Sequence, residues 1–542
     1  DQPWLTWVAL GACHAPHQAP ADLIKSYDAQ FAHGWDEERG RRLVRQKELG
    51  VVPENTRMPA RNDFVRDWDD HSEDERRVFT RLQAAYAAML DHADQHLARL
   101  VDFLERANLR DDTIVIVMSD NGASQEGGPL GMFNAMGPYN FRFETMDEKR
   151  KLIDSIGGPK SHTNFPLGWA MAANTPLRRY KQNTHGGGIR DPLVISWPKG
   201  IRARGELRHQ FAHASDLAPT LLDIVGVAPP QQINGISQQP MTGVSFRASL
   251  NDPDAPQRNR PQYFEMFGHR GIWRAGWKAV AYHPPTTPFD SDRWELFHLD
   301  ADFSETNDLA AEKPELLEEL KALWWKEAEA NHVLPLDDRF GPRFAENAKR
   351  YHGARTKFTL HAGMGHVPTD VAPDVRSRSY TIEADVSVPA GGAEGVLIAH
   401  GDATSGYSLY MRDGKLAHVL NIGGTQTVVT SDSPVPTGDR KLGLRVTRVT
   451  RIVPPQFGVG QGTSRYTLLI DGKEAGSVDT PLGFVTLISW SGLDIGFDRS
   501  SPVGDYAAPF KFTGELRKVT VTMDDDQKLD GDAVGNTEMA RQ

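Results

Sequence analysis

Residues 174–192 of the 542-residue chain read NTPLRRYKQNTHGGGIRDP, and an apolar run with strand character, Leu193 to Trp197, follows them. Glycines such as Gly186 to Gly188 let the backbone approach a ligand or another segment closely. A lysine beside such a turn, here Lys181, offers a mobile ammonium group to an anion. In isolation the pattern is more typical of a surface lysine ahead of a tight turn, so its interpretation depends on two further stretches.

Both further stretches combine an apolar run with polar residues. Residues 113–122 read TIVIVMSDNG, an apolar run that leads into Asp120 and Asn121. Near the start of the chain, the run Trp4 to Leu10 precedes GACHAPHQAP at 11–20. Ligands of open α/β sheets bind beyond the carboxyl ends of the strands. We therefore expect the three polar clusters to meet at one edge of a sheet.

Together these stretches resemble the type I sulfatases, close to the bacterial arylsulfatases of the alkaline phosphatase superfamily. The matching motifs follow the family's order: HAPHQAP at 14–20, SDNG at 119–122, TPLRxxK at 175–181 with GGIR at 187–190, and DLAPTLLDIVG at 216–226. The resemblance covers residues 1 to about 335. It implies an α/β fold with a mixed sheet, flanking helices and a small antiparallel C-terminal subdomain.

The resemblance also implies roles for individual residues. Lys181 matches the family lysine that contacts the sulfate, and His14 matches the histidine near the sulfate and the leaving-group oxygen. Asp120 and Asn121 match ligands of a divalent cation, Ca²⁺ or, in some relatives, Mg²⁺, and each offers the oxygen donor that such cations prefer. We interpret the neighbouring His17 as a solvent-facing loop residue.

Other residues near these motifs are expected to be structural. The region 123–165 lacks a clear period and is predicted to be an active-site lid or an insertion; we call it the lid segment. His162 and Trp169 would suit a wall for an aryl leaving group, but packing in or near the lid is the expectation for each. The remaining residues are given structural roles: His185 outside the pocket, Arg178 and Arg179 in packing or at the surface, and Asp216 at a helix start.

The family's nucleophile has no counterpart in this sequence. It is a formylglycine made from the cysteine or serine of a C/S-x-P-x-R motif, and that motif is absent. Cys13, the single cysteine, is followed by His-Ala-Pro-His without the required arginine, so we expect a small, buried residue at a strand end. The family's other metal ligands, an Asp pair, precede the nucleophile. This chain alone is therefore expected to be incomplete and inactive, with a second chain or an absent segment supplying the rest.

Composition limits the class of protein. The 39% hydrophobic and 25% charged residues indicate a soluble globular chain, and the length predicts two or three domains. The sequence contains no apolar run of 18 residues, so no transmembrane helix is predicted. The net charge of −11 argues against nucleic acid as a partner. A single cysteine precludes an internal disulfide and slightly favours the cytoplasm, although a signal peptide would lie upstream of this sequence.

Four parts are predicted along the chain. Residues 1–228 are the C-terminal part of the catalytic α/β domain, residues 229–340 a linker with the small subdomain, residues 356–525 a β-sandwich and residues 526–542 a frayed tail. Period-two alternation and Asp-Gly turns at 413–414 and 471–472 are typical of hairpins, and their order resembles a concanavalin-like or laminin-G-like sandwich. Its aromatic residues Tyr407, Tyr410 and Trp490 are expected in its core.

Helices and strands of the first two parts follow from local signals. The capping-box pattern at 72–75 opens a helix whose apolar residues recur at three- and four-residue steps up to Asn108. Residues 217–225 and 314–328 read as further helices, and 4–10, 113–118 and 193–197 as buried strands.

The predicted function is hydrolysis of aryl or other organic sulfate esters, whether small molecules or glycans. Two alternatives stay open. A phosphonate or phosphate monoester hydrolase of the same superfamily would differ in its nucleophile. A non-catalytic glycan-binding protein would bind sugars through residues 356–525.

Overall fold

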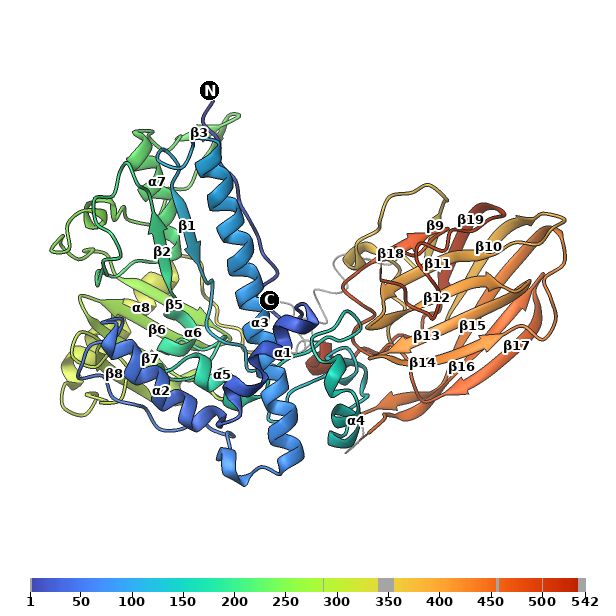
Figure 1. Ribbon diagram of the computed structural model, residues 1–542, viewed down its shortest axis with the longest axis horizontal. Helices are drawn as coiled ribbons and strands as arrows, with labels where there is room; N and C mark the ends of the chain where they lie inside the picture. Colours follow the sequence, from blue (N-terminus) through green and yellow to red (C-terminus); the bar gives the residue numbers. More distant parts are fainter. Residues whose placement is uncertain (1, 286, 340–354, 455–457, 500, 535–542) are drawn as a thin grey trace.

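The computed structural model describes residues 2–285, 287–339, 355–454, 458–499 and 501–534. An α/β part built from the first 335 residues lies beside an all-β part that begins at Lys357 (Figure 1). The predicted α/β fold followed by a separate sandwich is confirmed, but the strand pairs of the described residues are antiparallel, so the expected mixed sheet is not seen there. None of the described helices is both long enough and apolar enough to cross a membrane.

Helix α3 (Glu73–Arg106) is the longest helix of the α/β part, as the sequence predicts. The capping box forms, because the Ser72 hydroxyl accepts from the Glu75 amide while the Glu75 carboxylate accepts from the Ser72 amide at 2.8 Å. The helix packs with α1 (Ala21–Tyr27), and α2 (Gly34–Glu48) packs with α5 (Leu167–Ala173). The shared core is aromatic and contains Trp35, Trp68, Phe79 and Trp169.

Strands β1 (Val115–Met118) and β2 (Leu193–Ser196) pair antiparallel, with Met118 opposite Leu193. The end of β1 therefore lies beside the start of β2. The Asp120 and Asn121 segment follows β1, and the Lys181 stretch precedes β2, so the two polar clusters share one edge. The sequence predicted that these clusters meet, but for the wrong reason. We expected the carboxyl ends of the strands to lie together, whereas the antiparallel pairing places the carboxyl end of β1 beside the amino end of β2.

Residues 4–10 are not a strand, which corrects the sequence interpretation. The segment is extended but pairs with no strand of the described chain, and Trp4 and Trp7 are 54% and 87% exposed. A single strand cannot satisfy its backbone groups without a neighbour, so apolar composition alone does not make a strand. Cys13 accordingly lies in a turn and is only half-buried, which corrects the expected buried strand end.

The small antiparallel subdomain is confirmed. Its sheet contains β5 (Gln262–Met266), β6 (His269–Arg274), β7 (Trp277–Ala281) and β8 (Trp294–His298) in that order. Helix α8 (Pro314–Ala330) covers it, and Ile272, Leu296 and Trp324 are fully buried between them. Helix α7 (Leu217–Val225) matches its prediction, and Asp216 lies at its start in a buried ion pair with Arg258 at 2.7 Å.

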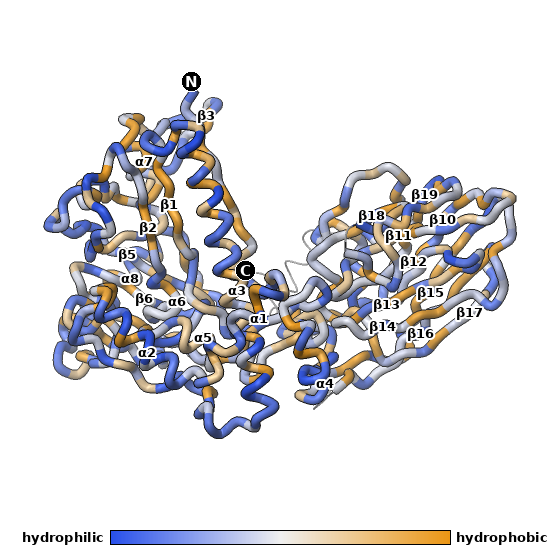
Figure 2. Tube along the Cα trace, viewed as in Figure 1, coloured by the Kyte–Doolittle hydropathy of each residue, from blue (hydrophilic) through white to orange (hydrophobic). Residues whose placement is uncertain are grey.

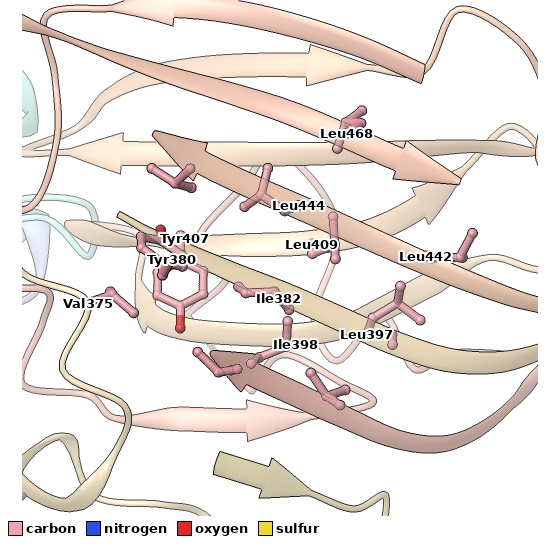
Figure 3. Close-up of a cluster of buried hydrophobic side chains, with 14 of the residues drawn as sticks. Val375, Tyr380, Ile382, Leu397, Ile398, Tyr407, Leu409, Leu442, Leu444 and Leu468 are labelled. Carbon is pink, nitrogen blue, oxygen red and sulfur yellow. The ribbon is translucent and has the colours of Figure 1, made fainter. Parts of the chain in front are cut away.

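The all-β part is a sandwich of a six-stranded sheet and a five-stranded sheet (Figure 1). Strict alternation of buried residues, as along β10, lets one face of each sheet enter a shared apolar core (Figures 2 and 3). The first sheet contains, in spatial order, β17 (Lys473–Thr480), β16 (Gln461–Ile470), β15 (Gly438–Val453), β10 (Tyr380–Val388), β19 (Glu515–Met523) and β9 (Lys357–Leu360). The second contains β14 (Thr425–Thr430), β13 (Lys415–Ile422), β12 (Ser405–Arg412), β11 (Gly395–Asp402) and β18 (Leu493–Ile495).

The predicted Asp-Gly hairpin turns are present in the sandwich. Asp413 and Gly414 have φ values of 52° and 70°, and Asp471 and Gly472 have 49° and 77°. Two successive residues with positive φ define the turn whose twist matches that of paired strands, and Asp-Gly adopts it readily. These four residues therefore set the register of two hairpins.

The lid segment joins the two parts of the molecule (Figure 1). Its α-helix is the short α4 (Met146–Lys151). The Asn134 side chain donates to the Thr404 carbonyl at 3.1 Å, and the Asn140 side chain accepts from the Val485 amide at 2.8 Å. Phe141 packs against Val485 in a small apolar cluster. The sandwich thus rests on the segment that lies next to the polar clusters.

Replacing Leu409 with alanine tests whether the sandwich core has the described packing. Leu409 is fully buried between the sheets, so Leu409→Ala should destabilise the protein by about 2–5 kcal/mol. Val428→Ala is the matched control, because Val428 is 50% exposed and should change the free energy of unfolding by less than about 0.5 kcal/mol. Urea unfolding measures both, and equal effects would contradict this core.

Candidate active site

Lys181 lies at the centre of the polar clusters and is only 5% exposed. Its Nζ atom is 3.4 Å from His14 Nε2 and 3.3 Å from Glu126 Oε1. The structure therefore brings the two predicted catalytic residues together. Glu126 was not predicted, because it lies in the lid segment without any local motif, and only the fold places it beside Lys181. A buried ammonium group needs such a partner, since an unpaired one is costly to desolvate.

The segment with Asp120 and Asn121 is tied to both flanks of Lys181. The ties are backbone or amide hydrogen bonds: Ser119 N to Pro192 O (3.4 Å), Gly122 N to Gly188 O (3.3 Å) and Ala123 N to Asn174 Oδ1 (2.9 Å). A further one, from Lys181 N to Ala123 O at 3.1 Å, fixes the lysine backbone itself. All the predicted site residues thus lie on segments that contact one another.

Gly122 is required by this close approach. A Cβ atom at that position would lie 1.8 Å from the Gly187 carbonyl oxygen. Gly187 in turn faces the carbonyls of Arg178 and Arg179, where a Cβ atom would lie within 2.2–2.4 Å of each oxygen. The glycines therefore permit contact between backbones, which is one of the two uses that the sequence suggested.

Asp120 and Asn121 offer oxygen atoms of the type that a hard cation binds, but too few of them for a complete site. Asp120 is exposed and Asn121 half-buried, so both side-chain oxygens are accessible to a hard cation. Asp191 lies close by: burial, followed by the negative charge of Asp120, raises the pKa of Asp191 to about 7. No group of three or more His, Cys, Asp or Glu among the described residues is arranged to hold a metal ion. Two oxygens fill only part of the six to eight positions that Ca²⁺ takes.

His17 is buried, which corrects its interpretation as a solvent-facing residue. It is 2% exposed, and its ring contacts those of Tyr86 and Phe165 at centroid distances of 5.1 and 4.9 Å. The His14–Pro20 loop turns inward because it bonds the end of the lid segment, as in His17 N to Thr163 O at 3.0 Å. Burial, with smaller contributions from other histidines, lowers the pKa of His17 to about 3.

His162 lies at the boundary between the lid segment and the sandwich. It is 5% exposed, and its ring is 5.0 Å from that of Trp490. Burial lowers the pKa of His162 to about 4; the charge of Asp402 opposes this shift and that of His14 adds to it. Trp490 is therefore not a core residue of the sandwich, contrary to expectation. Tyr407 lies in the core between the sheets, and Tyr410 is buried in a second apolar cluster of the sandwich. Trp169 is fully buried in the helical core.

The small subdomain forms ion pairs with the stretch that carries Lys181, residues 174–192. His185 Nε2 is 2.9 Å from Glu295 Oε2, and Arg178 Nη1 is 3.0 Å from the other oxygen of that carboxylate. Burial alone would raise the pKa of Glu295, but the His185 hydrogen bond and the Arg178 charge lower it to about 2. Arg179 lies over the Tyr282 ring at 3.9 Å. His185, Arg178 and Arg179 thus have the structural roles that were expected.

A second buried carboxylate fixes the glycine turn. Glu305 accepts from the Gly186 amide at 3.0 Å and from Lys278 Nζ at 2.6 Å. Both side chains of the ion pair are no more than 3% exposed. Helix α6 (Gly186–Ile189) therefore begins against the small subdomain, and the geometry of the Lys181 stretch depends on that contact.

Comparisons with known proteins identify the family. The sulfatase family matches residues 1–227, and the family described as N-sulphoglucosamine sulphohydrolase, C-terminal, matches residues 180–330. An uncharacterised sulfatase of Schizosaccharomyces pombe is 30% identical over 346 residues, covering 62% of this chain and 60% of that protein. An arylsulfatase of Klebsiella aerogenes is 28% identical over 273 residues, covering 49% of this chain and 55% of that protein. A putative sulfatase, yidJ, of Bacteroides fragilis has a similar structure with 16% identity, a TM-score of 0.30 and 57% coverage of each chain.

The region up to residue 330 therefore belongs to the type I sulfatases, as the motifs indicated. The chain spans 55–60% of the length of the two curated relatives.

Glu305→Gln tests the contact with the small subdomain. The change removes the charge that compensates Lys278, so it should destabilise the protein by about 3–5 kcal/mol and increase hydrogen exchange at residues 178–190. Glu319→Gln removes half of an exposed pair with Arg274 and should cost less than about 1 kcal/mol. Equal effects of the two substitutions would contradict the proposed importance of Glu305.

The buried His17 predicts a particular pH dependence. The unfolded chain binds a proton at this residue near pH 6.5, whereas the folded chain resists protonation down to about pH 3. Stability should therefore fall as pH falls between these values, by up to about 1.4 kcal/mol per pH unit from this group. His17→Gln should flatten the pH dependence of the unfolding free energy, and exposed His361→Gln should not. Identical slopes for wild type and His17→Gln would contradict the burial.

Proposed function

We propose that this protein hydrolyses organic sulfate esters, and that Lys181 and His14 are the catalytic residues present in the chain. The observation that carries the proposal is the 3.4 Å approach of Lys181 Nζ, on a side chain that is 5% exposed, to Nε2 of the half-buried His14. An ammonium group and an imidazole together suit a sulfate group and its leaving oxygen. The ammonium group stabilises negative charge on the sulfate, and the imidazole donates a hydrogen bond or a proton to the leaving oxygen.

Each residue has a defined task in this proposal. Lys181 binds a sulfate oxygen as a point charge, while His14 contacts the oxygen that departs with the alcohol. Gly122 and Gly187 let the segment with Asp120 and Asn121 approach the backbone of the stretch that carries Lys181. Asp120 and Asn121 would hold part of a divalent cation, Ca²⁺ or Mg²⁺, which would neutralise charge on the sulfate. The nucleophile, a formylglycine, would come from a segment other than residues 1–542, and a second chain is one source.

The names of the relatives suggest the class of substrate. One is an arylsulfatase, and others are an N-acetylglucosamine-6-O-sulfatase of Bacteroides thetaiotaomicron and N-acetylgalactosamine-6-sulfatases of mammals. We therefore propose aryl and glycan sulfate esters as the substrates to test first.

Two other functions predict different chemistry. A phosphonate or phosphate monoester hydrolase of the same superfamily would carry a nucleophile that is not formylglycine. A non-catalytic protein would bind glycans through the sandwich without turning over any ester. Peptide mass spectrometry on the native protein separates these cases, because only a sulfatase of this type requires an aldehyde at a C/S-x-P-x-R site.

Substitution of the two residues tests their roles. In the full-length protein, Lys181→Ala and His14→Ala should each reduce kcat/KM for 4-nitrophenyl sulfate by about 100-fold to 10,000-fold. Lys199→Ala is the matched control, because Lys199 is exposed and forms a surface ion pair with Asp112. Unchanged activity in either variant, or activity of residues 1–542 alone, would refute this assignment.

A further inference from the structure

The sandwich contacts the lid segment through one aromatic side chain that lies outside the sandwich core. Trp490 lies on the connection between β17 and β18, and its ring is 5.0 Å from His162 and 6.3 Å from Tyr139. Both partners belong to the lid segment. Tyr407 lies in the core between the sheets and Tyr410 in a second buried cluster of the sandwich, whereas Trp490 belongs to neither and contacts the lid segment instead.

The path from Trp490 to His14 is short. The strand-like end of the lid segment that carries His162 bonds the His14–Pro20 loop: Gln18 Nε2 donates to Ser161 O at 2.7 Å, and Thr163 Oγ1 donates to His17 O at 2.6 Å. The charge of His14 also contributes, after burial, to the lowered pKa of His162. Trp490 therefore contacts a histidine whose segment is hydrogen-bonded to the loop that begins at His14.

Two nitrogen atoms at this contact lack partners. Neither His162 Nε2 nor Trp490 Nε1 has a hydrogen-bond partner among the described residues, although both atoms are buried. His162 is 95% buried as a whole. A buried polar atom without a partner is unfavourable, so a ligand that supplies the partner gains free energy on binding. A ring that carries hydroxyl groups supplies such partners, and a plain aryl ring does not.

Asp402 holds the turn that presents Trp490. Its carboxylate accepts from the hydroxyls of Ser489 and Ser491, the two residues that flank Trp490, and from the Thr404 amide at 2.7 Å. The Thr404 carbonyl in turn accepts from Asn134 of the lid segment. A site is selective when its side chains are held in place before the ligand arrives, and these bonds hold both sides of the contact.

We propose that Trp490 determines substrate specificity by stacking on the sugar ring of a sulfated pyranose whose sulfate lies between Lys181 and His14. This inference rests on the proposed function and names its substrate class. Asp402 is a positioning residue that acts through Trp490, while Trp490 Nε1 and His162 Nε2 bond hydroxyls of the sugar. The sandwich is thus part of the substrate site of the α/β part, not an independent binding module.

Kinetics of the full-length protein test the inference. The substrates are N-acetylglucosamine 6-sulfate, N-acetylgalactosamine 6-sulfate and 4-nitrophenyl sulfate. Trp490→Ala should lower kcat/KM for the better sugar sulfate by about 10-fold to 100-fold, because the stacking surface and a hydrogen bond are lost. The same variant should change kcat/KM for the aryl ester by less than about 3-fold. Trp325→Ala, at an exposed tryptophan on α8, is the matched control and should leave the ratio of the two values unchanged.

A double variant tests the role of Asp402. Asp402→Asn should reduce activity on the sugar sulfate but not on the aryl ester, and its effect should be absent when Trp490 is already alanine. Additive effects of the two substitutions would contradict a role through Trp490.

The outcomes separate this inference from the proposed function. Equal losses on both ester classes in Trp490→Ala, or no loss on either, would overturn the inference. Wild-type turnover of the aryl ester but of neither sugar sulfate would also overturn it, while the proposed function would stand. Failure of the wild type to hydrolyse any sulfate ester would overturn the proposed function and this inference together.

Discussion

The buried ammonium group of Lys181 is the constraint on which the rest of the site depends. Removing a charge from water is unfavourable unless the protein supplies partners, and here the partners come from distant parts of the chain. His14 lies on a loop near the start, and Glu126 lies in the lid segment. Keeping these groups together requires that their segments contact closely, which explains the paired backbones at Gly122 and Gly187.

Two further regions stabilise this arrangement from opposite sides. The small subdomain contributes Glu295 and Glu305, which bind His185 and the Gly186 amide on one side of the lysine stretch. The sandwich contacts the lid segment on the other side through Thr404, Val485 and Trp490. Both regions are remote from Lys181 in sequence. The candidate site is therefore a product of the whole fold, and none of the three regions positions the candidate catalytic residues alone.

Local signals in the sequence were sufficient for many elements. The capping box at Ser72 and the apolar period predicted α3, and the Asp-Gly pairs predicted two hairpins of the sandwich, because each signal acts within a few residues. The motifs also predicted that His14 and Lys181 lie together. The run from Trp4 to Leu10 was misinterpreted, since a strand needs a partner that composition does not reveal.

Long-range contacts were the features that could not be predicted. Nothing near Glu126 indicates that it pairs with Lys181, and nothing near Trp490 separates it from the core aromatics of the sandwich. His17 was misjudged for the same reason, because its burial depends on hydrogen bonds with residues near 163. Which strands are antiparallel also decides which polar clusters meet, and the apolar pattern of a short strand is the same in either direction.

The central claim is that Lys181 and His14 form a sulfate-binding site in the folded protein. A crystal structure of the full-length protein with bound inorganic sulfate, the reaction product, tests it most directly. We predict a sulfate oxygen within hydrogen-bond distance of both Lys181 Nζ and His14 Nε2, with Asp120 and Asn121 facing a cation beside it. A structure in which Lys181 keeps Glu126 and His14 as its only polar partners, with sulfate bound elsewhere, would contradict the account.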